Sequence, residues 1–273
     1  MTSDSGKAHR SRWRRLTRSP LFDIIQFVAL VLIIIIFFVH SSENLGYYWQ
    51  WYQVPKYIFT LSEDGFAAGP LLEGLWVTFR ISGISLVISF AIGLLTALLR
   101  LSNSFIAQTI ARLYLETIRN TPLLIQLFFI YFVVGPVMGL SRFPSAILAL
   151  SLFEGAYASE IFRAGIVSIH RGQWEAAYSL GLGSFHMYMY IILPQAIRRI
   201  LPPLTSQAIS LIKDSALVST IAIYDLTMQA QAIISETFLT FELWFTVAGM
   251  YLAVTITLSI VVSIMEKRMK VVT

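Results

Sequence analysis

The sequence contains no cysteine in its 273 residues. Without a thiol, the chain cannot form a disulfide framework, an iron–sulfur cluster or a thiolate zinc site, and it has no thiol nucleophile. It also has no Gly-x-x-x-x-Gly-Lys-Ser/Thr loop, no His-Glu-x-x-His pair and no Gly-x-Ser-x-Gly elbow, and its four histidines are scattered. We therefore expect no catalytic residue, no metal site and no cofactor. Any energy from ATP has to enter through another subunit.

Charged residues are scarce as well, at 13% of the chain against 56% for hydrophobic residues. A soluble domain carries about 25% charged residues, so much of this chain must face lipid. A net charge of +5 could suggest a nucleic-acid partner. The basic residues, however, lie in short clusters beside apolar runs instead of on a polar domain. We expect a lipid bilayer and no nucleic acid as partner.

Six apolar runs are long enough to cross a hydrocarbon core of roughly 30 Å. Runs of this length favour helices, because the edge of an open sheet would leave backbone amides unpaired in lipid. The sequence also lacks the short alternating segments of a membrane barrel. The predicted fold is therefore an all-α integral membrane protein with about six transmembrane helices. The expected spans cover residues 21–39, 75–99, 118–140, 144–165, 204–222 and 243–265.

The distribution of lysine and arginine predicts the orientation, because short loops rich in these residues stay in the cytoplasm. Six crossings from a cytoplasmic start leave only Lys56 and Arg142 in outside loops, so both termini are predicted to be cytoplasmic. The residues counted as cytoplasmic are Lys7, Arg10, Arg12, Arg14, Arg15, Arg18, Arg100, Arg112, Arg119, Arg171, Arg198, Arg199, Lys267, Arg268 and Lys270.

The first apolar run has two interpretations. Its basic leader and the small residues near Ser41 would also suit a signal peptide with a cleavage site, but the run is long for that purpose, so we favour a retained anchor. The predicted organisation has a basic cytoplasmic segment, an extra helix with an interfacial segment, a transport domain and a cytoplasmic tail. These cover residues 1–20, 21–73, 74–265 and 266–273. The aromatic stretch from Tyr47 to Tyr52 lies in the second of these and suits a membrane–water interface.

The most informative motif follows the fourth expected span. It runs Glu175-Ala176-Ala177, three residues, Gly181, nine residues, Ile191, one residue, Leu193-Pro194. Residues 175–180 can form a short helix, whose two alanines would keep one face thin enough for a groove on another protein. Gly181 can end that helix with a left-handed cap, and Pro194 limits any helix that passes through it. The pattern predicts a compact helix-turn unit.

This spacing resembles the signature loop of permease subunits of bacterial ABC importers. Three further stretches are similar to the polar amino-acid type of that family, which includes histidine, glutamine and arginine permeases. They are residues 119–126, 155–166 and 213–217. In the first, Thr121 could cap a helix whose first position is Pro122. The likeness covers the chain from about Gly74 onward and implies a five-helix core preceded by one extra helix.

The resemblance also implies partners and a mechanism. A pair of cytoplasmic ATP-binding subunits would dock on the loop through Glu175, Ala176, Ala177 and Gly181. A second permease, identical or related, would complete the path, and a periplasmic or extracellular binding protein would deliver the amino acid. The chain would then lie in the bacterial inner membrane and transport by alternating access. The alternatives are a secondary transporter driven by an ion gradient and a membrane scaffold, neither of which requires the signature loop.

Charges inside the expected spans are the candidate substrate site, because a charge at the bilayer centre costs about 2.5–3.5 kcal/mol on insertion scales. Glu154 lies near the midplane, where it could attract an ammonium group, or it could bond to Lys213 or Arg80. Lys213 and Asp214 are adjacent and point to different faces, and we leave helix bonding and pathway lining open for both. Glu160 and Arg163 are three residues apart, which predicts a local ion pair.

Overall fold

The computed structural model describes residues 20–44, 46–62 and 65–269. The predictions for the basic leader before Pro20 and for Lys270 lie outside these residues. The chain divides into two units between Gln50 and Trp51. In the described part of the first unit, helix α2 spans Pro20–Asn44 and passes through the candidate cleavage region at residues 39–41. Its side chains from Ile24 to Ile36 are mostly exposed and apolar, which suits a helix surrounded by lipid.

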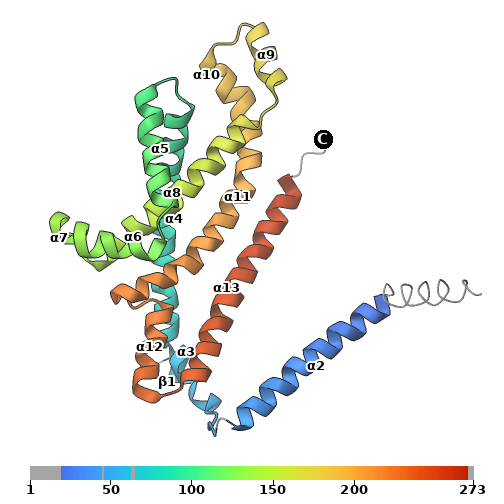
Figure 1. The fold of residues 1–273 in the computed structure, drawn as a ribbon, viewed down its shortest axis with the longest axis vertical. Coiled ribbons are helices and arrows are strands. Elements are labelled where there is room, and N and C mark those ends of the chain that lie inside the picture. The colour runs from blue at the N-terminus through green and yellow to red at the C-terminus, as the bar shows by residue number, and fades with distance from the viewer. Residues whose placement is uncertain (1–19, 45, 63–64, 270–273) are drawn as a thin grey trace, which may run out of the picture. The chain divides into compact units, whose positions relative to one another are not determined.

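The second unit is a bundle of long helices with one small hairpin (Figure 1). Strands β1 (Phe59–Ser62) and β2 (Gly65–Ala68) pair antiparallel, with Phe59 opposite Ala68. The all-α prediction missed this hairpin. The helical elements, in order, are η1 (Trp51–Gln53), α3 (Pro55–Ile58), α4 (Pro70–Leu101), α5 (Phe105–Arg119), α6 (Leu123–Phe129), η2 (Ile130–Val134), α7 (Gly135–Met138), α8 (Arg142–Val167), α9 (Arg171–Ser179), α10 (Ser184–Met187), η3 (Tyr188–Ile192), α11 (Leu193–Asp214), η4 (Ser215–Ile221), α12 (Leu226–Thr237) and α13 (Thr240–Met269).

Within the described residues, three helices are long and apolar enough to cross a membrane, and the number rises to five if each of two bent pairs counts as one span. Helices α4, α8 and α13 contain the expected spans 75–99, 144–165 and 243–265. The fifth expected span, 204–222, lies within a longer helical run, Ser184–Ile221, except for its last residue, and this run is followed by α12 after a bend of 46°. The all-α membrane fold is confirmed.

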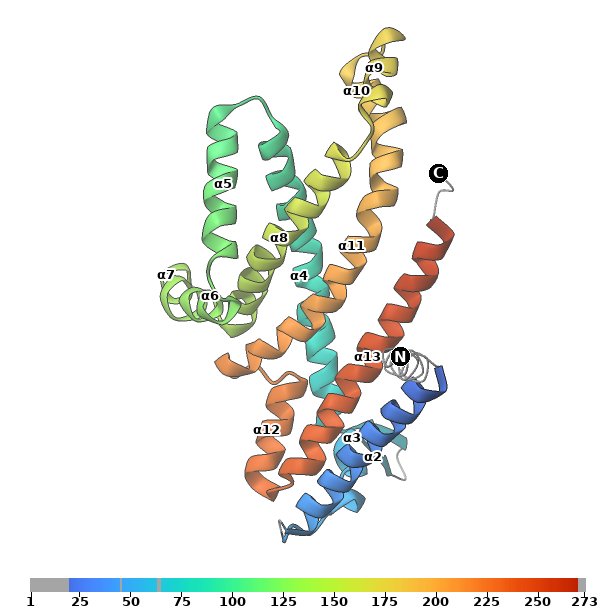
Figure 2. The same ribbon diagram turned by 45° about the vertical axis from the view of Figure 1, so that its right-hand side comes forward.

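The third expected span, 118–140, is wrong at its start. The helical path begins with α5 at Phe105, and α6 leaves α5 at an angle of 106° (Figure 2). Arg112 and Arg119 consequently lie on α5, which the prediction did not include as part of a span. Arg119 is 14 residues from Phe105, or about 21 Å along the helix at 1.5 Å per residue. The span was missed because charged residues interrupt the apolar run of α5.

Gln126 braces the bend between α5 and α6. Its buried amide donates hydrogen bonds to the backbone oxygens of Ile118 (2.7 Å) and Thr121 (3.0 Å) and to the hydroxyl of Thr121 (2.8 Å). Thr121 itself donates to the carbonyl of Thr117 and does not cap α6, and Pro122 occupies the N-cap position itself. The prediction of a Thr121 cap with Pro122 at the first helical position was therefore wrong by one residue.

Helices α4 and α8 form the centre of the bundle and lie side by side in both ribbon views (Figures 1 and 2). Small residues permit this approach. A Cβ atom added to Gly93 would lie 2.8 Å from the Cβ of Ala158, and one added to Gly155 would lie 2.9 Å from Ile92. Small residues at helix contacts are typical of membrane proteins, because close packing drives association where lipid offers no hydrophobic force.

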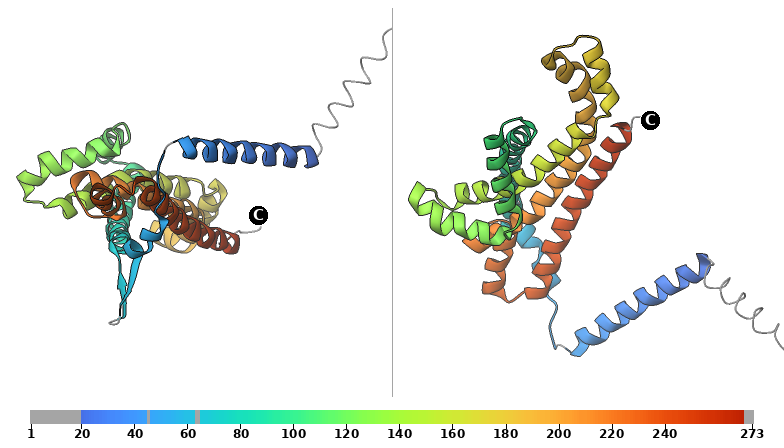
Figure 3. Two further views of the ribbon diagram at one scale, coloured as in Figure 1. Left: turned by 90° about the horizontal axis from the view of Figure 1, so that it is seen from below. Right: turned by 45° about the horizontal axis from the view of Figure 1, so that its top comes forward.

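A π-helical segment, η3, joins α10 to α11 without a break, so one helical run continues from Ser184 to Ile221. Pro194 lies in the first turn of α11, directly after this segment. Proline has no amide hydrogen to donate, and a π-bulge is one way for a helix to continue past the missing bond. Figure 3 shows the α9–α10 unit at the end of the long α11 helix.

Candidate functional site

The helix of the signature motif is α9, and its end has the predicted left-handed cap. Gly181 has φ +71°, its amide donates to the carbonyl of Tyr178 (2.9 Å), and the amide of Leu182 donates to that of Ala177 (3.2 Å). These two bonds form a Schellman motif, in which glycine avoids the strain of a left-handed backbone. At the other end, the His170 imidazole accepts from the amide of Gly172 (3.1 Å).

The two alanines of α9 have different environments. Ala176 is exposed, whereas Ala177 is fully buried within its own chain, in one apolar cluster with Met187 and Ile192. The prediction that both alanines form an open docking face is therefore wrong for Ala177. The exposed face carries Glu175, Ala176 and the side chain of Leu180, which is 76% exposed.

Aromatic and amide contacts tie α9 to the helix that follows it. The Trp174 ring meets the Tyr188 ring edge-on at 5.3 Å, and the Gln195 amide donates to Gln173 at 3.4 Å. These contacts join α9 to the continuous helix that α10, η3 and α11 form, so the predicted helix-turn unit is present. The prediction that Pro194 limits a helix at this point was wrong, because the helical run from Ser184 to Ile221 passes through it.

Glu154 is buried at the centre of α8, with 1% of its surface exposed. One carboxyl oxygen accepts a hydrogen bond from the Gln207 amide on α11, and the other has no donor among the described residues. Asp214 is close enough for the two carboxyl groups to interact electrostatically. Neither Lys213 nor Arg80, the two partners considered as an alternative to a substrate role, bonds to Glu154 in the described structure. Gln207 was missed because nothing in the sequence pairs it with a residue 53 positions away.

Lys213 and Asp214 lie on different faces of α11, as their adjacency predicts. Lys213 is exposed, and Asp214 is half-buried beside Glu154. Arg80 also points elsewhere, with its guanidinium 5.6 Å from the centre of the Phe143 ring. The structure thus brings together two of the three candidate substrate residues, Glu154 and Asp214.

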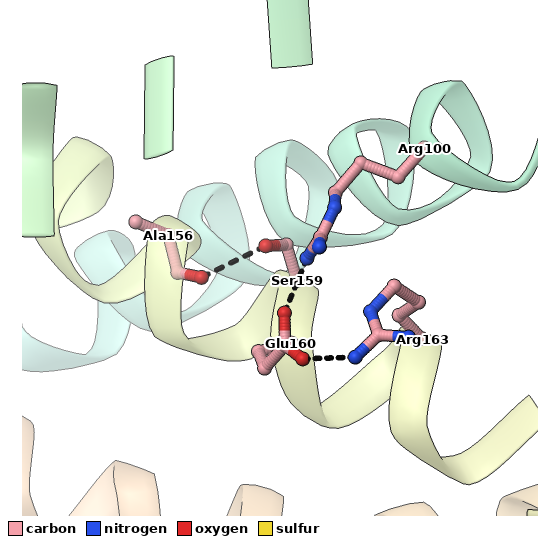
Figure 4. Close-up of polar contacts among 5 residues, drawn as sticks. All are labelled: Arg100, Ala156, Ser159, Glu160 and Arg163. Atoms are coloured by element: carbon pink, nitrogen blue, oxygen red, sulfur yellow. Dashed lines mark hydrogen bonds and ion pairs between the residues drawn. The ribbon is translucent and has the colours of Figure 1, made fainter. Parts of the chain in front are cut away.

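Glu160 is held by two arginines from different parts of the sequence. One carboxyl oxygen binds Arg163, one turn away on α8, and the other binds Arg100 at the end of α4 (Figure 4). The predicted Glu160–Arg163 pair is confirmed. Arg100 is 60 positions away in sequence, so spacing could not indicate it. The three charged side chains join α4 to α8, at the end of the bundle where α9 lies.

A pocket of about 420 Å³ lies between α8 and α11, next to the end of α5. Glu160 is one of its lining residues. Its polar lining residues are Arg119, Tyr157, Glu160, Ser168, Arg199 and Gln207. The described residues contain no cluster of three or more acidic or histidine side chains arranged to hold a metal ion.

Comparison with known proteins identifies the family. The family described as binding-protein-dependent transport system inner membrane component matches residues 89–271. The chain belongs to this family. It is therefore a transport component with a membrane-spanning fold, and nothing in the comparisons supports a secondary transporter.

Several relatives are similar over most of their length. The glutamine transport system permease protein GlnP of Escherichia coli K12 is 39% identical over 204 residues, which are 74% of this chain and 93% of GlnP. The probable glutamine ABC transporter permease protein GlnM of Bacillus subtilis is 38% identical, over 73% of this chain and 93% of GlnM. The L-cystine permease TcyB of the same organism is 42% identical, over 60% and 71%.

Solved structures agree with these relatives. The crystal structure of an amino acid ABC transporter with histidines matches with a TM-score of 0.69 and 38% identity, over 73% of this chain and 94% of the matched chain. An inward-facing MetNI methionine ABC transporter matches with a TM-score of 0.63 at 18% identity, over 74% and 96%, and supports the fold alone.

Proposed function

We propose that this permease imports polar amino acids by alternating access, driven by ATP hydrolysis in two separate cytoplasmic subunits that dock on α9. A second permease, identical or related, and an external binding protein complete the system. The observation that carries the proposal is the signature helix itself. It is closed by Gly181, presents Glu175 and Ala176 outward, and contacts η3 and α11 through the Trp174 and Gln173 side chains.

The proposed substrate class is based on the names of the relatives and on the neighbouring carboxyl groups of Glu154 and Asp214. The relatives named above are glutamine and cystine permeases, and a solved neighbour is an amino acid transporter. Two interacting carboxyl groups inside a membrane bundle favour the approach of a cation, and every amino acid carries an ammonium group. We assign Glu154 and Asp214 to the ammonium group, with Lys213 at the edge of the path.

The orientation and the division of the chain belong to the same proposal. Both termini face the cytoplasm, because α9 has to meet the ATPase on that side. Residues 1–20 and 266–273 are then cytoplasmic segments, residues 21–73 hold the extra helix and the outer interfacial segment, and residues 74–265 form the transport domain. Basic residues such as Arg171 and Lys267 lie on the cytoplasmic side under this arrangement.

Reconstitution tests the proposal directly. The permease is co-expressed with its ATPase subunit and placed in liposomes with the binding protein, and uptake of labelled L-glutamine and L-cystine is measured. We expect uptake that requires ATP inside the liposomes and persists when an ionophore collapses ion gradients. Uptake that follows an imposed ion gradient without ATP would contradict it. Gly181→Pro, which cannot adopt a positive φ, should remove ATP-driven uptake while leaving membrane insertion intact.

A further inference from the structure

Helix α5 has one buried face and one exposed apolar face. The helix runs beside α4 and contacts both α4 and α8 (Figure 2). Ala111 and Leu115 on it are buried, whereas Ile106, Ile110 and Leu113 are exposed. Because the three exposed apolar residues are four and three positions apart, they form a single stripe, which suits contact with lipid.

A third face of α5 is charged and exposed. It consists of Arg112, Glu116 and Arg119, again four and three positions apart. At 3.6 residues per turn, its centre lies about 120° around the helix from the centre of the apolar stripe. Among the described residues, none of these three side chains forms an ion pair within 4.0 Å. Glu116 accepts from the neutral Asn120 amide at 2.9 Å, and Arg119 lies 5.7 Å from the centre of the Tyr157 ring. The chain itself therefore does not neutralise these charges.

A contact with α8 indicates the depth of the charged face. The Tyr114 hydroxyl donates to the backbone oxygen of Leu152 at 2.6 Å, two residues from Glu154, which the span prediction places near the midplane. The three charged residues lie within five positions of Tyr114, or about 8 Å along α5. They consequently lie well inside a hydrocarbon core of roughly 30 Å. A charged side chain at this depth is unfavourable against lipid and needs water or a partner.

The charged face of α5 continues into the pocket of about 420 Å³ between α8 and α11. Arg119 lines this pocket from the deep end of α5, and Ser168 and Arg199 line it toward α9. Gln207 lines it as well and donates to Glu154. Polar side chains thus extend from the Glu154 group to the end of the bundle where α9 lies.

We propose that the charged face of α5 lines a water-filled path, through which the amino acid passes from the Glu154 group to the cytoplasm. The inference rests on the proposed function, since it assumes an amino-acid substrate. A zwitterion inside a membrane protein needs water or polar groups along its route, because both of its charges would otherwise be desolvated. The charged face carries both signs and suits such a molecule, whereas the apolar face of α5 contacts lipid.

Thiol labelling distinguishes the two exposed faces, because the chain contains no cysteine. Single-cysteine variants of the permease are assembled with its ATPase subunit in inside-out membrane vesicles without nucleotide. The vesicles are treated with a charged methanethiosulfonate reagent that does not cross the bilayer, and the labelled fraction of the permease is followed with time. The reagent attacks the thiolate, whose formation is disfavoured in apolar surroundings.

We expect Arg112→Cys and Glu116→Cys to react at least about tenfold faster than Ile110→Cys and Leu113→Cys, since each unit by which apolar surroundings raise the pKa of a thiol lowers its thiolate fraction about tenfold. The two control positions lie within two turns of the charged ones, so they differ mainly in face and little in depth. Labelling of Glu116→Cys should also stop ATP-driven uptake of L-glutamine, whereas the same treatment of Leu113→Cys should leave uptake unchanged.

Labelling of Arg112→Cys and Glu116→Cys that is no faster than that of the two controls overturns the inference. A disulfide between two copies of Glu116→Cys, with little labelling, also overturns it, since a second permease would then cover the charged face. Both charged residues are exposed and form no ion pair in the described structure, so either variant remains informative if the other does not fold. Failure of the proposed function is a separate result, in which the wild-type system shows no ATP-driven uptake while the difference in labelling persists.

Discussion

Leucine substitutions at the two adjacent alanines of α9 should give opposite results. Ala177 is fully buried in its own chain, and adding the leucine atoms to a packed site costs about 1–3 kcal/mol. At roughly 2–4 °C for each kcal/mol in a protein of this size, Ala177→Leu should lower the thermal midpoint of the permease by about 2–12 °C. Ala176 is exposed, so Ala176→Leu should change stability by no more than about 0.5 kcal/mol.

The assay has two readouts on each variant. The first is thermal unfolding of the purified permease in detergent, and the second is the amount of ATPase that co-purifies with it. We expect Ala176→Leu to be stable and to retain little ATPase, because the added side chain blocks the docking face, while Ala177→Leu is unstable on its own. If Ala177→Leu unfolds at the wild-type temperature, or if Ala176→Leu binds ATPase normally, the assignment of the two faces of α9 is refuted.

Three other predictions concern the core of the bundle. Glu154→Gln should weaken amino-acid binding and slow uptake while the complex assembles normally, and unchanged affinity and rate would remove Glu154 from the substrate site. Glu160→Gln leaves Arg100 and Arg163 facing each other and should lower the thermal midpoint by about 2–8 °C, whereas the exposed control Glu116→Gln should not. Gln126→Met removes the bonds that brace the α5–α6 bend and should cost about 1–3 kcal/mol in unfolding experiments, a loss that a wild-type midpoint would exclude.

Sequence predicts α4, α8 and α13 because each contains a long apolar stretch with few charges. Helix α5 and the first part of α11 were not predicted, since Arg112, Glu116 and Arg119 interrupt the apolar residues of α5, and Arg198 and Arg199 interrupt those of α11. Thr121-Pro122 is a typical helix-start pattern, and helix α6 does begin directly after it, at Leu123. The bend between α5 and α6 was not predicted, because the Gln126 amide that braces it acts through contacts that no local pattern encodes.

The same difference between local and long-range contacts separates the site features that sequence predicts from those that it does not. The Schellman cap at Gly181 and the Glu160–Arg163 pair depend on residues within one or two turns, so spacing predicts them. The bond from Gln207 to Glu154 and the second partner of Glu160 join helices distant in sequence, and they depend on how the bundle packs. The burial of Ala177 belongs to this second group, since it comes from the turn back onto Met187.

The π-helical segment at Tyr188–Ile192 takes up one extra residue in the helix that leads from α10 to α11. A π-bulge widens a single turn of an α-helix, so the helices on its two sides keep nearly the same rotational phase. A chain shortened by one residue there would continue as an ordinary α-helix, and Glu175 and Ala176 would keep their direction relative to α11. The length of this segment can therefore change by one residue without redirecting the exposed face of α9.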